Sequence, residues 1–230
     1  MPDWDVIDQE QIPGEDGVLY LMAQGDEYVI HVNGRELMGN TEHGSEDALA
    51  YLACDRLMDR DAARVLVGGL GMGFTMAAAL RRLGPEAVVT VAELIPAVVR
   101  WNREYLGAAA NHPLRDKRAI VHIGDVADLV ETPQRPWSAI LLDVDNGPRA
   151  LTRPYNAWLY GKKGLKAAYE ALIPGGVLGI WSAAPDSNLT RRLRETHFEV
   201  EVVPHVELER KTQDESGVHV LWMARRPATG

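Results

Sequence analysis

The glycine-rich stretch at residues 65–75, VLVGGLGMGFT, is the feature that most constrains the fold of this chain. Three apolar residues lead into it and an alanine-rich helical pattern follows, which predicts a buried strand, a tight turn and a helix start. Its glycines are Gly68, Gly69, Gly71 and Gly73. Without side chains they leave the backbone N–H groups of the turn open to a ligand. The stretch therefore predicts the first strand–turn–helix unit of an α/β domain.

The spacing of these glycines separates two classes of nucleotide-binding loop. The dinucleotide pattern G-x-G-x-x-G, begun at Gly69, requires glycine at the position of Phe74. The remaining G-x-G-x-G form is typical of proteins that bind S-adenosylmethionine or a close relative. A turn that is tight only for packing is the alternative, since a glycine loop alone does not define a function.

Three later strand patterns end in acidic residues. Residues 88–93 end in Glu93, residues 119–125 end in Gly124 and Asp125, and residues 137–143 end in Asp143. Because parallel strands end at one edge of a doubly wound sheet, we expect these carboxylates to line one crevice. There Glu93 would accept hydrogen bonds from the ribose hydroxyls of an adenosine, and Asp125 would accept one from the adenine amino group. Helix capping explains one such acid but does not account for three in a row.

The chain divides into two parts by pattern. Residues 1–62 contain two short strand patterns joined by a turn and then a helix expected near Ser45, which predicts a small β-rich N-terminal lobe with a linking helix. In residues 63–230 strands and helices alternate, which predicts a mostly parallel sheet with helices on both sides. Near its end we expect a helix at 165–172 closed by Pro-Gly-Gly, a strand at 177–181, and a strand pair at 198–203 and 218–223.

Composition excludes several classes of partner. The formal net charge of −9 argues against a nucleic-acid or anionic-membrane surface. Cys54 is the single cysteine, so neither a disulfide framework nor a thiolate metal site is expected, and the histidines show no metal-ligand spacing. No apolar stretch is long enough for a membrane helix and the N-terminus lacks a signal-peptide pattern, so we expect a cytoplasmic protein.

Over residues 64–224 the order of these motifs resembles the class I S-adenosylmethionine-dependent methyltransferase fold. Four features within it are similar to the spermidine synthase family: the double glycine, the segment DVDNGP at 143–148, the Leu159-Tyr160 pair before a helix, and the β-rich N-terminal lobe. The resemblance implies a Rossmann-like, doubly wound, mostly parallel seven-stranded sheet. Those enzymes act in polyamine biosynthesis and carry an aminopropyl group from decarboxylated S-adenosylmethionine to an amine. The resemblance thus also implies this donor, a small-molecule amine acceptor and a homodimer.

The resemblance implies that Asp143, at the fourth strand end, lies beside the reacting amine. Because Asp143 is also expected at the switch-point crevice beside the glycine loop, it is the candidate general base, and Asp145 is a candidate to hold the far side of the substrate. Tyr155 completes the candidate catalytic set, and His43, Asn146 and Tyr160 form the candidate acceptor-binding set. The alternatives are a turn cap for Asp143, a solvated side chain for Asp145 and core packing for the tyrosines.

The chain departs from the family pattern at three places. In the family an acid of the glycine loop contacts the donor's amine, and in this chain Gly71 occupies that position. The second acid of the family's Asp-x-x-Asp-Pro motif is displaced or replaced by Asn146. The family's N-terminal glutamine and Tyr-His-Glu have no clean counterpart, and Leu37 and residues 46–48 fall near those places. Because a diamine needs carboxylates at both ends, we expect a relative that diverges from putrescine-using enzymes.

Three functions stay open: aminopropyl-type transfer to an amine, methyl transfer from S-adenosylmethionine to a small molecule, and nucleoside binding without catalysis. The N-terminal lobe and the Asp143 segment favour the first function, and the missing loop acid favours the second. Glu93 and Asp125 count against the third, since they would keep the donor site. The two donors differ by one carboxylate, so the deciding feature is whether the pocket offers that carboxylate a partner.

Overall fold

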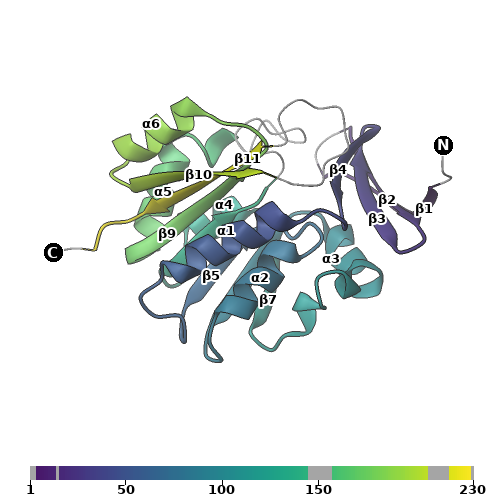
Figure 1. Cartoon of the computed structure of the whole chain (residues 1–230), viewed down its shortest axis with the longest axis horizontal. Helices are drawn as coiled ribbons and strands as arrows, with labels where there is room; N and C mark the ends of the chain where they lie inside the picture. Colours follow the sequence, from purple (N-terminus) through teal and green to yellow (C-terminus); the bar gives the residue numbers. More distant parts are fainter. Residues whose placement is uncertain (1–3, 14–15, 145–156, 207–217, 229–230) are drawn as a thin grey trace.

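A computed structural model gives the structure of the chain and describes residues 4–13, 16–144, 157–206 and 218–228. Its strands form two sheets, which lie at opposite ends of the view in Figure 1. The N-terminal sheet has four antiparallel strands and the second sheet has seven strands. Among the described residues no helix is long and apolar enough to cross a membrane.

The N-terminal sheet has the strand order β1-β2-β3-β4. Its strands are β1 (Asp5–Gln11), β2 (Val18–Gln24), β3 (Glu27–Val32) and β4 (Arg35–Gly39). Residues along β2 alternate between buried and half-buried, so Leu19 and Leu21 face the core, as a period of two predicts. This sheet confirms the β-rich N-terminal lobe. Strand β1 was not predicted, because its sequence is polar and mostly exposed and shows no apolar alternation.

The seven-stranded sheet has the order β10-β11-β9-β8-β5-β6-β7. Its strands are β5 (Arg64–Gly68), β6 (Val88–Glu93), β7 (Ala119–Ile123), β8 (Trp137–Leu142), β9 (Leu172–Ser182), β10 (Glu199–Val206) and β11 (Val218–Arg225). Strands β5 to β9 are parallel, and β11 is antiparallel to both of its neighbours. The order reverses beside β5, and ligands bind at such a switch point. The predicted mostly parallel seven-stranded sheet is confirmed.

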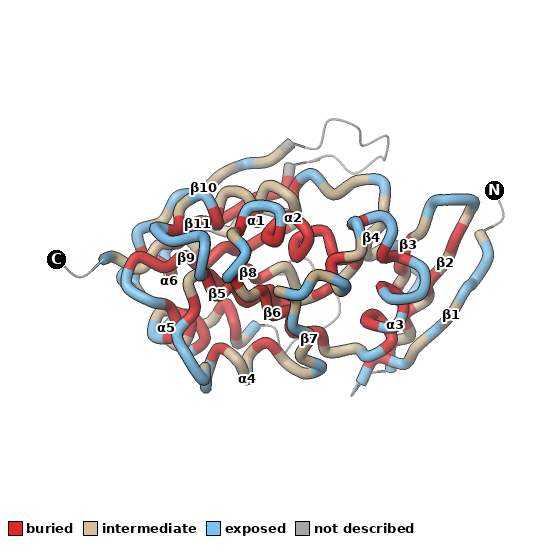
Figure 2. The backbone as a smooth tube through the Cα atoms, turned by 90° about the horizontal axis from the view of Figure 1, so that it is seen from below, coloured by how far each residue is buried: buried red, intermediate tan, exposed pale blue. Residues whose placement is uncertain are grey.

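Helices cover both faces of the seven-stranded sheet. The first layer is α1 (Gly44–Asp55), α2 (Phe74–Arg82) and α3 (Pro96–Glu104), with the short 3-10 helices η1 (Leu106–Ala108) and η2 (Pro113–Arg115). The second layer is α4 (Val126–Glu131), α5 (Lys162–Ala171) and α6 (Ser187–Glu195). Each layer has its own apolar cluster against the sheet, and Figure 2 shows buried residues running along the strands between the layers.

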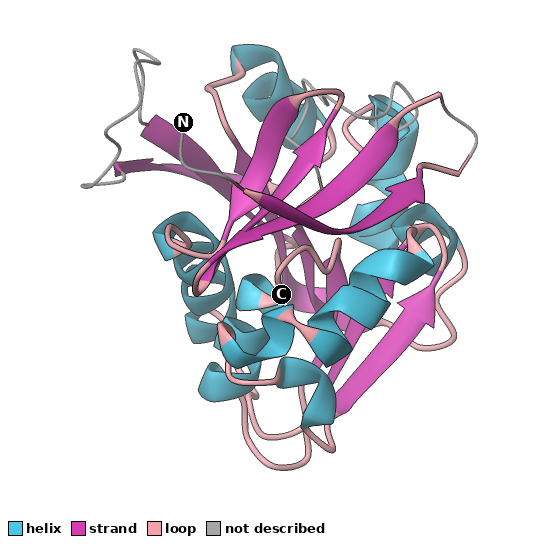
Figure 3. Cartoon of the chain, turned by 90° about the vertical axis from the view of Figure 1, so that its right-hand side faces the viewer, coloured by secondary structure: helices cyan, strands magenta, loops and turns pink. Residues whose placement is uncertain are grey.

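The N-terminal lobe and the main sheet share one core. Leu19, Leu21 and Ile30 of the lobe belong to the same apolar cluster as Leu49 of α1 and Trp101 of α3. Helix α1 lies against α2, β8, β9 and β11, so the predicted linking helix packs on the larger domain. Figure 3, viewed from the side of the N-terminal sheet, shows its strands in front of the helices. The division between residues 62 and 63 stays a prediction.

The segment after α5 differs from the expectation. We predicted a Pro-Gly-Gly turn followed by a short strand, whereas β9 is 11 residues long and begins at Leu172, directly after the helix. The backbone pairs Gly175 N–H to the Arg226 carbonyl at 2.9 Å and Arg226 N–H to the Gly176 carbonyl at 2.8 Å. These bonds to the C-terminal segment extend the strand. A local sequence pattern cannot predict them, because their partner lies far away in the sequence.

Candidate active site

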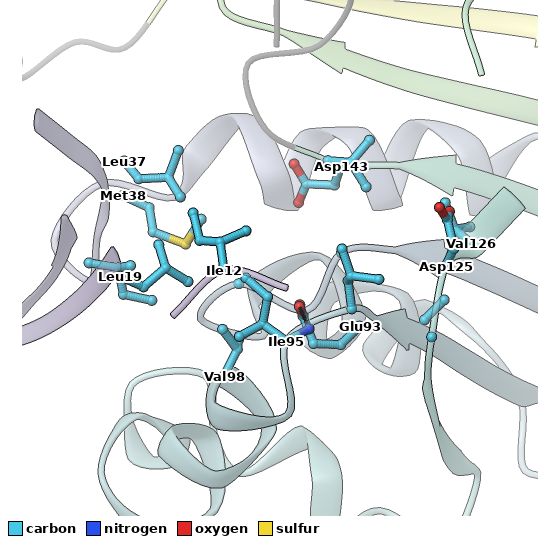
Figure 4. A pocket seen from close by; sticks show the side chains of 17 residues that line it. Ile12, Leu19, Leu37, Met38, Glu93, Ile95, Val98, Asp125, Val126 and Asp143 are labelled. Carbon is cyan, nitrogen blue, oxygen red and sulfur yellow. Dashed lines mark hydrogen bonds between the residues drawn. The ribbon is translucent and has the colours of Figure 1, made fainter. Parts of the chain in front are cut away.

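A cavity opens at the carboxyl edge of the main sheet (Figure 4). The N-terminal lobe provides an apolar wall that includes Ile12, Leu19, Leu37 and Met38. The strand ends and the glycine loop provide the other wall, with Gly69, Gly71, Glu93, Gly124, Asp125 and Asp143 among its residues. The cavity therefore brings together the predicted strand-end acids, which is the expected consequence of parallel strands at a switch point.

The loop between β5 and α2 has the conformation that its glycines predict. Gly69 has a φ of +86° and Gly71 a φ of +50°, a region that side chains disfavour. A Cβ atom at Gly69 would collide with the carbonyl oxygen of Asp143. The loop therefore lies this close to the end of β8 only because residue 69 is glycine.

Gly68 and Gly73 serve packing rather than the cavity lining. A Cβ at Gly68 would lie 3.0 Å from Val126 Cγ2, and one at Gly73 would lie 3.0 Å from Asn102 Oδ1. Neither glycine is among the residues that line the cavity. The packing alternative describes these two positions, whereas Gly69 and Gly71 lie on the cavity wall.

Glu93 ends β6 and is 8% exposed. Its Oε2 accepts a hydrogen bond from the Leu70 N–H at 2.9 Å, and its Oε1 accepts one from the Ile95 N–H at 2.8 Å. These bonds hold the carboxylate on the cavity wall between the glycine loop and α3. The carboxylate of Glu93 lines the cavity beside these two bonds. The geometry is compatible with a ribose contact, and that role stays a prediction.

Asp125 follows β7 and is half-buried. Its Oδ1 accepts a hydrogen bond from the Ala127 N–H at 2.8 Å and so caps the N-terminus of α4. One oxygen of Asp125 therefore acts as the helix cap that the sequence analysis gave as an alternative. Asp125 also lines the cavity, so its second oxygen remains compatible with the predicted adenine contact. The Gly124 N–H donates to the Glu93 carbonyl oxygen at 2.9 Å and joins the two strand ends.

Asp143 lies directly after β8, at the switch point of the sheet. Its Oδ2 accepts a hydrogen bond from Thr75 Oγ1 at 2.5 Å, and Figure 4 shows its carboxylate across the cavity from Glu93. Burial raises the pKa of the Asp143 carboxyl to about 7, the negative charge of Glu46 adds to this, and the Thr75 bond opposes it. A group with a pKa near neutrality both takes up and releases a proton readily, as a general base must.

A second cavity adjoins the first. The two share Leu37, Met38, Gly71 and Asp143 as lining residues. The remaining lining of the second cavity consists of Gly39, Glu46, Leu70, Met72, Phe74 and Trp181. Glu46 lies in the first turn of α1 and received no site role from the sequence, although the acid itself stands near the family's N-terminal motif. Its place depends on how α1 packs, which the local pattern does not show.

His43 and Tyr160 lie outside the lining of both cavities. His43 is half-buried, its ring stacks on Phe74 with centroids 4.1 Å apart, and its Nδ1 lies 3.3 Å from Asp47 Oδ2. Its stacking partner Phe74 lines the second cavity, whereas His43 itself does not. Tyr160 is 2% exposed and packs in the apolar cluster beneath α4, α5 and α6. The core-packing alternative describes Tyr160, whose ring is buried away from the site.

The remaining predicted site residues are Asp145, Asn146 and Tyr155, and they lie outside the described residues. Their proposed contacts to the acceptor stay predictions. The described part of the site therefore contains its donor side and Asp143, together with the walls of the two cavities from the N-terminal lobe, α1 and β9.

The strand order, the switch-point cavity and the N-terminal antiparallel sheet define a class I methyltransferase-like fold with an added β lobe. A crystal structure of spermidine synthase from Thermotoga maritima is similar with a TM-score of 0.76 and 20% sequence identity, over 97% of this chain and 74% of that chain. A crystal structure of spermidine synthase with the transition state analogue AdoDATO has a TM-score of 0.75 and 20% identity, over 97% and 73% of the two chains.

Neither a protein-family model nor a curated protein sequence matches this chain. The structural similarity at this identity establishes the fold, including the resemblance to spermidine synthase that the motifs predicted. Substrate and reaction depend on the residues of the site itself.

Proposed function

We propose that this protein is a spermidine synthase-like transferase that moves an aminopropyl group from decarboxylated S-adenosylmethionine to an amine. One observation carries the proposal. Among the described residues that line the two cavities, the charged side chains are carboxylates, and no Lys or Arg is present. These carboxylates are Glu46, Glu93, Asp125 and Asp143.

This charge pattern separates the two candidate donors. Decarboxylated S-adenosylmethionine carries a sulfonium and an ammonium, and both are attracted by carboxylates. S-adenosylmethionine carries an additional carboxylate, which would enter this lining without a cationic partner and lose its hydration. The described lining therefore favours the decarboxylated donor over the donor of a methyltransferase. The similarity in fold to spermidine synthase supports the same choice.

In the proposed reaction the first cavity holds the nucleoside. Glu93 accepts hydrogen bonds from the ribose hydroxyls, Asp125 accepts one from the adenine amino group, and the apolar wall of the N-terminal lobe excludes water. This arrangement holds the sulfonium near Gly71 and Asp143, where the two cavities meet. Orientation is the main contribution that the protein makes to such a displacement.

Asp143 acts as the general base of the proposed reaction. The acceptor ammonium gives one proton to the Asp143 carboxylate, and the resulting amine attacks the propyl carbon bound to sulfur. The new C–N bond forms as the C–S bond breaks, and the electron pair of the C–S bond goes to sulfur. The products are the aminopropylated amine, positively charged at the new nitrogen, and methylthioadenosine. The raised pKa of Asp143 suits this proton transfer.

Calorimetric titration tests the proposal with three ligands side by side: decarboxylated S-adenosylmethionine, S-adenosylmethionine and methylthioadenosine. We expect the decarboxylated donor to bind more tightly than S-adenosylmethionine, and methylthioadenosine to appear when the donor is mixed with a panel of amines. Preference for S-adenosylmethionine would replace the proposal with methyl transfer. Binding of none of the three would favour the non-catalytic alternative.

A further inference from the structure

The second cavity continues the first in the direction that the donor's arm must take. In the proposed complex Glu93 and Asp125 hold the nucleoside end of the donor in the first cavity. Gly71 and Asp143 line both cavities, so they mark the passage between them. A donor whose nucleoside lies against Glu93 therefore extends its sulfur substituents past Gly71 into the second cavity.

Glu46 presents an oriented carboxylate to that second cavity. The Ser45 hydroxyl donates a hydrogen bond to Glu46 Oε2 at 2.6 Å. The same hydroxyl lies 2.9 Å from Nδ1 of His219 on β11, and both Ser45 and His219 are buried. Because the single hydroxyl proton points to Glu46, the Ser45 oxygen accepts from the His219 Nδ1–H. The chain His219–Ser45–Glu46 thus orients the carboxylate from the interior of the fold.

The glycine loop on the other side provides no charge. Residues 68–73 carry no ionisable side chain. A Cβ at Gly71 would lie 3.0 Å from Met38 Sδ, so a side chain there would require the Met38 side chain to shift. A carboxylate that pairs with an ammonium in the second cavity must therefore come from another element. Among the described lining residues of this cavity, Glu46 and Asp143 are the ones that carry charge.

The two carboxylates interact with each other. Glu46 and Asp143 line the same cavity, and the negative charge of Glu46 is one of the causes that raise the pKa of Asp143. A cation bound beside both would remove this repulsion. An ammonium group is therefore the ligand that the pair accommodates best.

Trp181 provides a second, independent observation at the same wall. It is 9% exposed and lines the second cavity. The indole offers an aromatic surface to a cation, and Phe74 and Met72 offer an apolar one to methylene groups.

We infer that Glu46, with Asp143, binds the terminal ammonium of the donor's three-carbon arm, and that Ser45 and His219 are positioning residues that orient Glu46. The inference rests on the proposed function, since it requires a donor with such an arm. Glu46 then also selects the donor, because S-adenosylmethionine would bring its own carboxylate close to that of Glu46.

The test compares two thioethers that lack the sulfonium charge and differ only in the arm, which carries an ammonium in one of them. One is methylthioadenosine, and the other is its analogue with an aminopropyl group in place of the methyl group. We expect Glu46→Gln to weaken binding of the aminopropyl analogue by about tenfold or more and to change binding of methylthioadenosine by less than about twofold. Ser45→Ala is expected to weaken binding of the analogue by about threefold and to leave binding of methylthioadenosine unchanged.

Asp47→Asn is the matched control on the same helix. The Asp47 carboxylate bonds to Arg81 at 2.7 Å and is absent from the lining of both cavities, so we expect the ratio of the two affinities to stay at its wild-type value. Binding of methylthioadenosine reports in each variant that the nucleoside site is folded.

Equal effects of Glu46→Gln on both ligands, or no effect on either, would overturn the inference. A raised KM for the amine with unchanged binding of the analogue would also overturn it, by assigning Glu46 to the acceptor. These failures are distinguishable from failure of the proposed function, in which the wild-type protein does not prefer the decarboxylated donor. If Glu46→Gln does not fold, Ser45→Ala tests the inference through the same ratio, that of the affinities for the aminopropyl analogue and for methylthioadenosine.

Discussion

At the scale of the single residue, Glu93 tests the donor side of the site. Its carboxylate accepts two loop N–H bonds and lines the first cavity. We expect Glu93→Ala to weaken binding of methylthioadenosine by roughly 1–3 kcal/mol, because the ribose hydroxyls lose a buried acceptor. Calorimetry measures the change. Thermal unfolding is its control, since the Leu70 and Ile95 N–H groups also lose their partner. An unchanged affinity would remove Glu93 from the ribose site.

Asp143 tests the catalytic side. With a pKa of about 7 its carboxyl is protonated below neutrality, so a base at this position is lost as the pH falls. We expect kcat/KM for the donor, which reports the enzyme before the donor's ammonium is bound, to rise with pH through about 7. Asp143→Asn is expected to abolish turnover and to leave methylthioadenosine binding intact. Turnover that survives in this variant would show that a different residue takes the proton.

The raised pKa of Asp143 also has a consequence for stability. The folded protein holds this proton up to about pH 7, whereas the unfolded chain releases it near the ordinary value of 3.8. The contribution of Asp143 to the free energy of unfolding is therefore greatest below pH 3.8 and is lost as the pH rises through 7. We expect Asp143→Asn to be more stable than wild type at high pH, with a difference that shrinks toward low pH. Urea unfolding across this range measures it, and a pH-independent difference would contradict it.

The strand-end acids were predictable because parallel strands bring their carboxyl ends to one edge. Glu93, Asp125 and Asp143 need no tertiary detail beyond that rule. Glu46 was not predictable as a site residue, because its position depends on how α1 packs against the main sheet. Tyr160 shows a related dependence: an aromatic residue before a helix suits either a pocket or a core, and here it is buried in the core.

At the scale of the element, the glycine loop depends on one close contact. Gly69 combines a φ of +86° with backbone contact to Asp143 that leaves no room for a Cβ. We expect Gly69→Ala to destabilise the protein by on the order of 2–4 kcal/mol, from backbone strain and displacement of the end of β8. Denaturant unfolding measures the loss.

Gly25 provides a matched comparison for this substitution. It has a φ of +61° in a turn of the N-terminal lobe, and a Cβ there would meet no atom within 4 Å. Gly25→Ala should therefore show only the conformational cost, about 1 kcal/mol. Similar losses in the two variants would mean that the contact of Gly69 with Asp143 adds nothing to the stability of the loop.

Elements with a strong apolar period were predicted well, and elements held by distant partners were not. The buried strands β5, β6 and β8 have continuous apolar runs, which local pattern recognises. Strand β1 is polar and exists through its pairing with β2, and the start of β9 depends on bonds to Arg226. Such pairings join segments far apart in sequence. A short stretch of sequence therefore does not show the stabilisation that they provide.

At the scale of the whole molecule, the candidate site belongs to both sheets. Leu37 and Met38 of the N-terminal lobe line both cavities, facing the loop and strand ends of the main sheet. The two parts also share one apolar cluster, so a ligand in the cavity contacts both parts of a common core. Binding of the nucleoside should therefore stabilise both sheets together rather than the main sheet alone.

Hydrogen exchange of the full chain tests this coupling. We expect methylthioadenosine to slow amide exchange in β4, in the loop at residues 69–73 and in residues 93–98, because each of these segments contributes to the cavity wall. Exchange in α6, which lies on the opposite layer and outside both cavities, should change little. Protection confined to the main sheet would contradict a shared site. The N-terminal lobe would then be a neighbour of the nucleoside site rather than one of its walls.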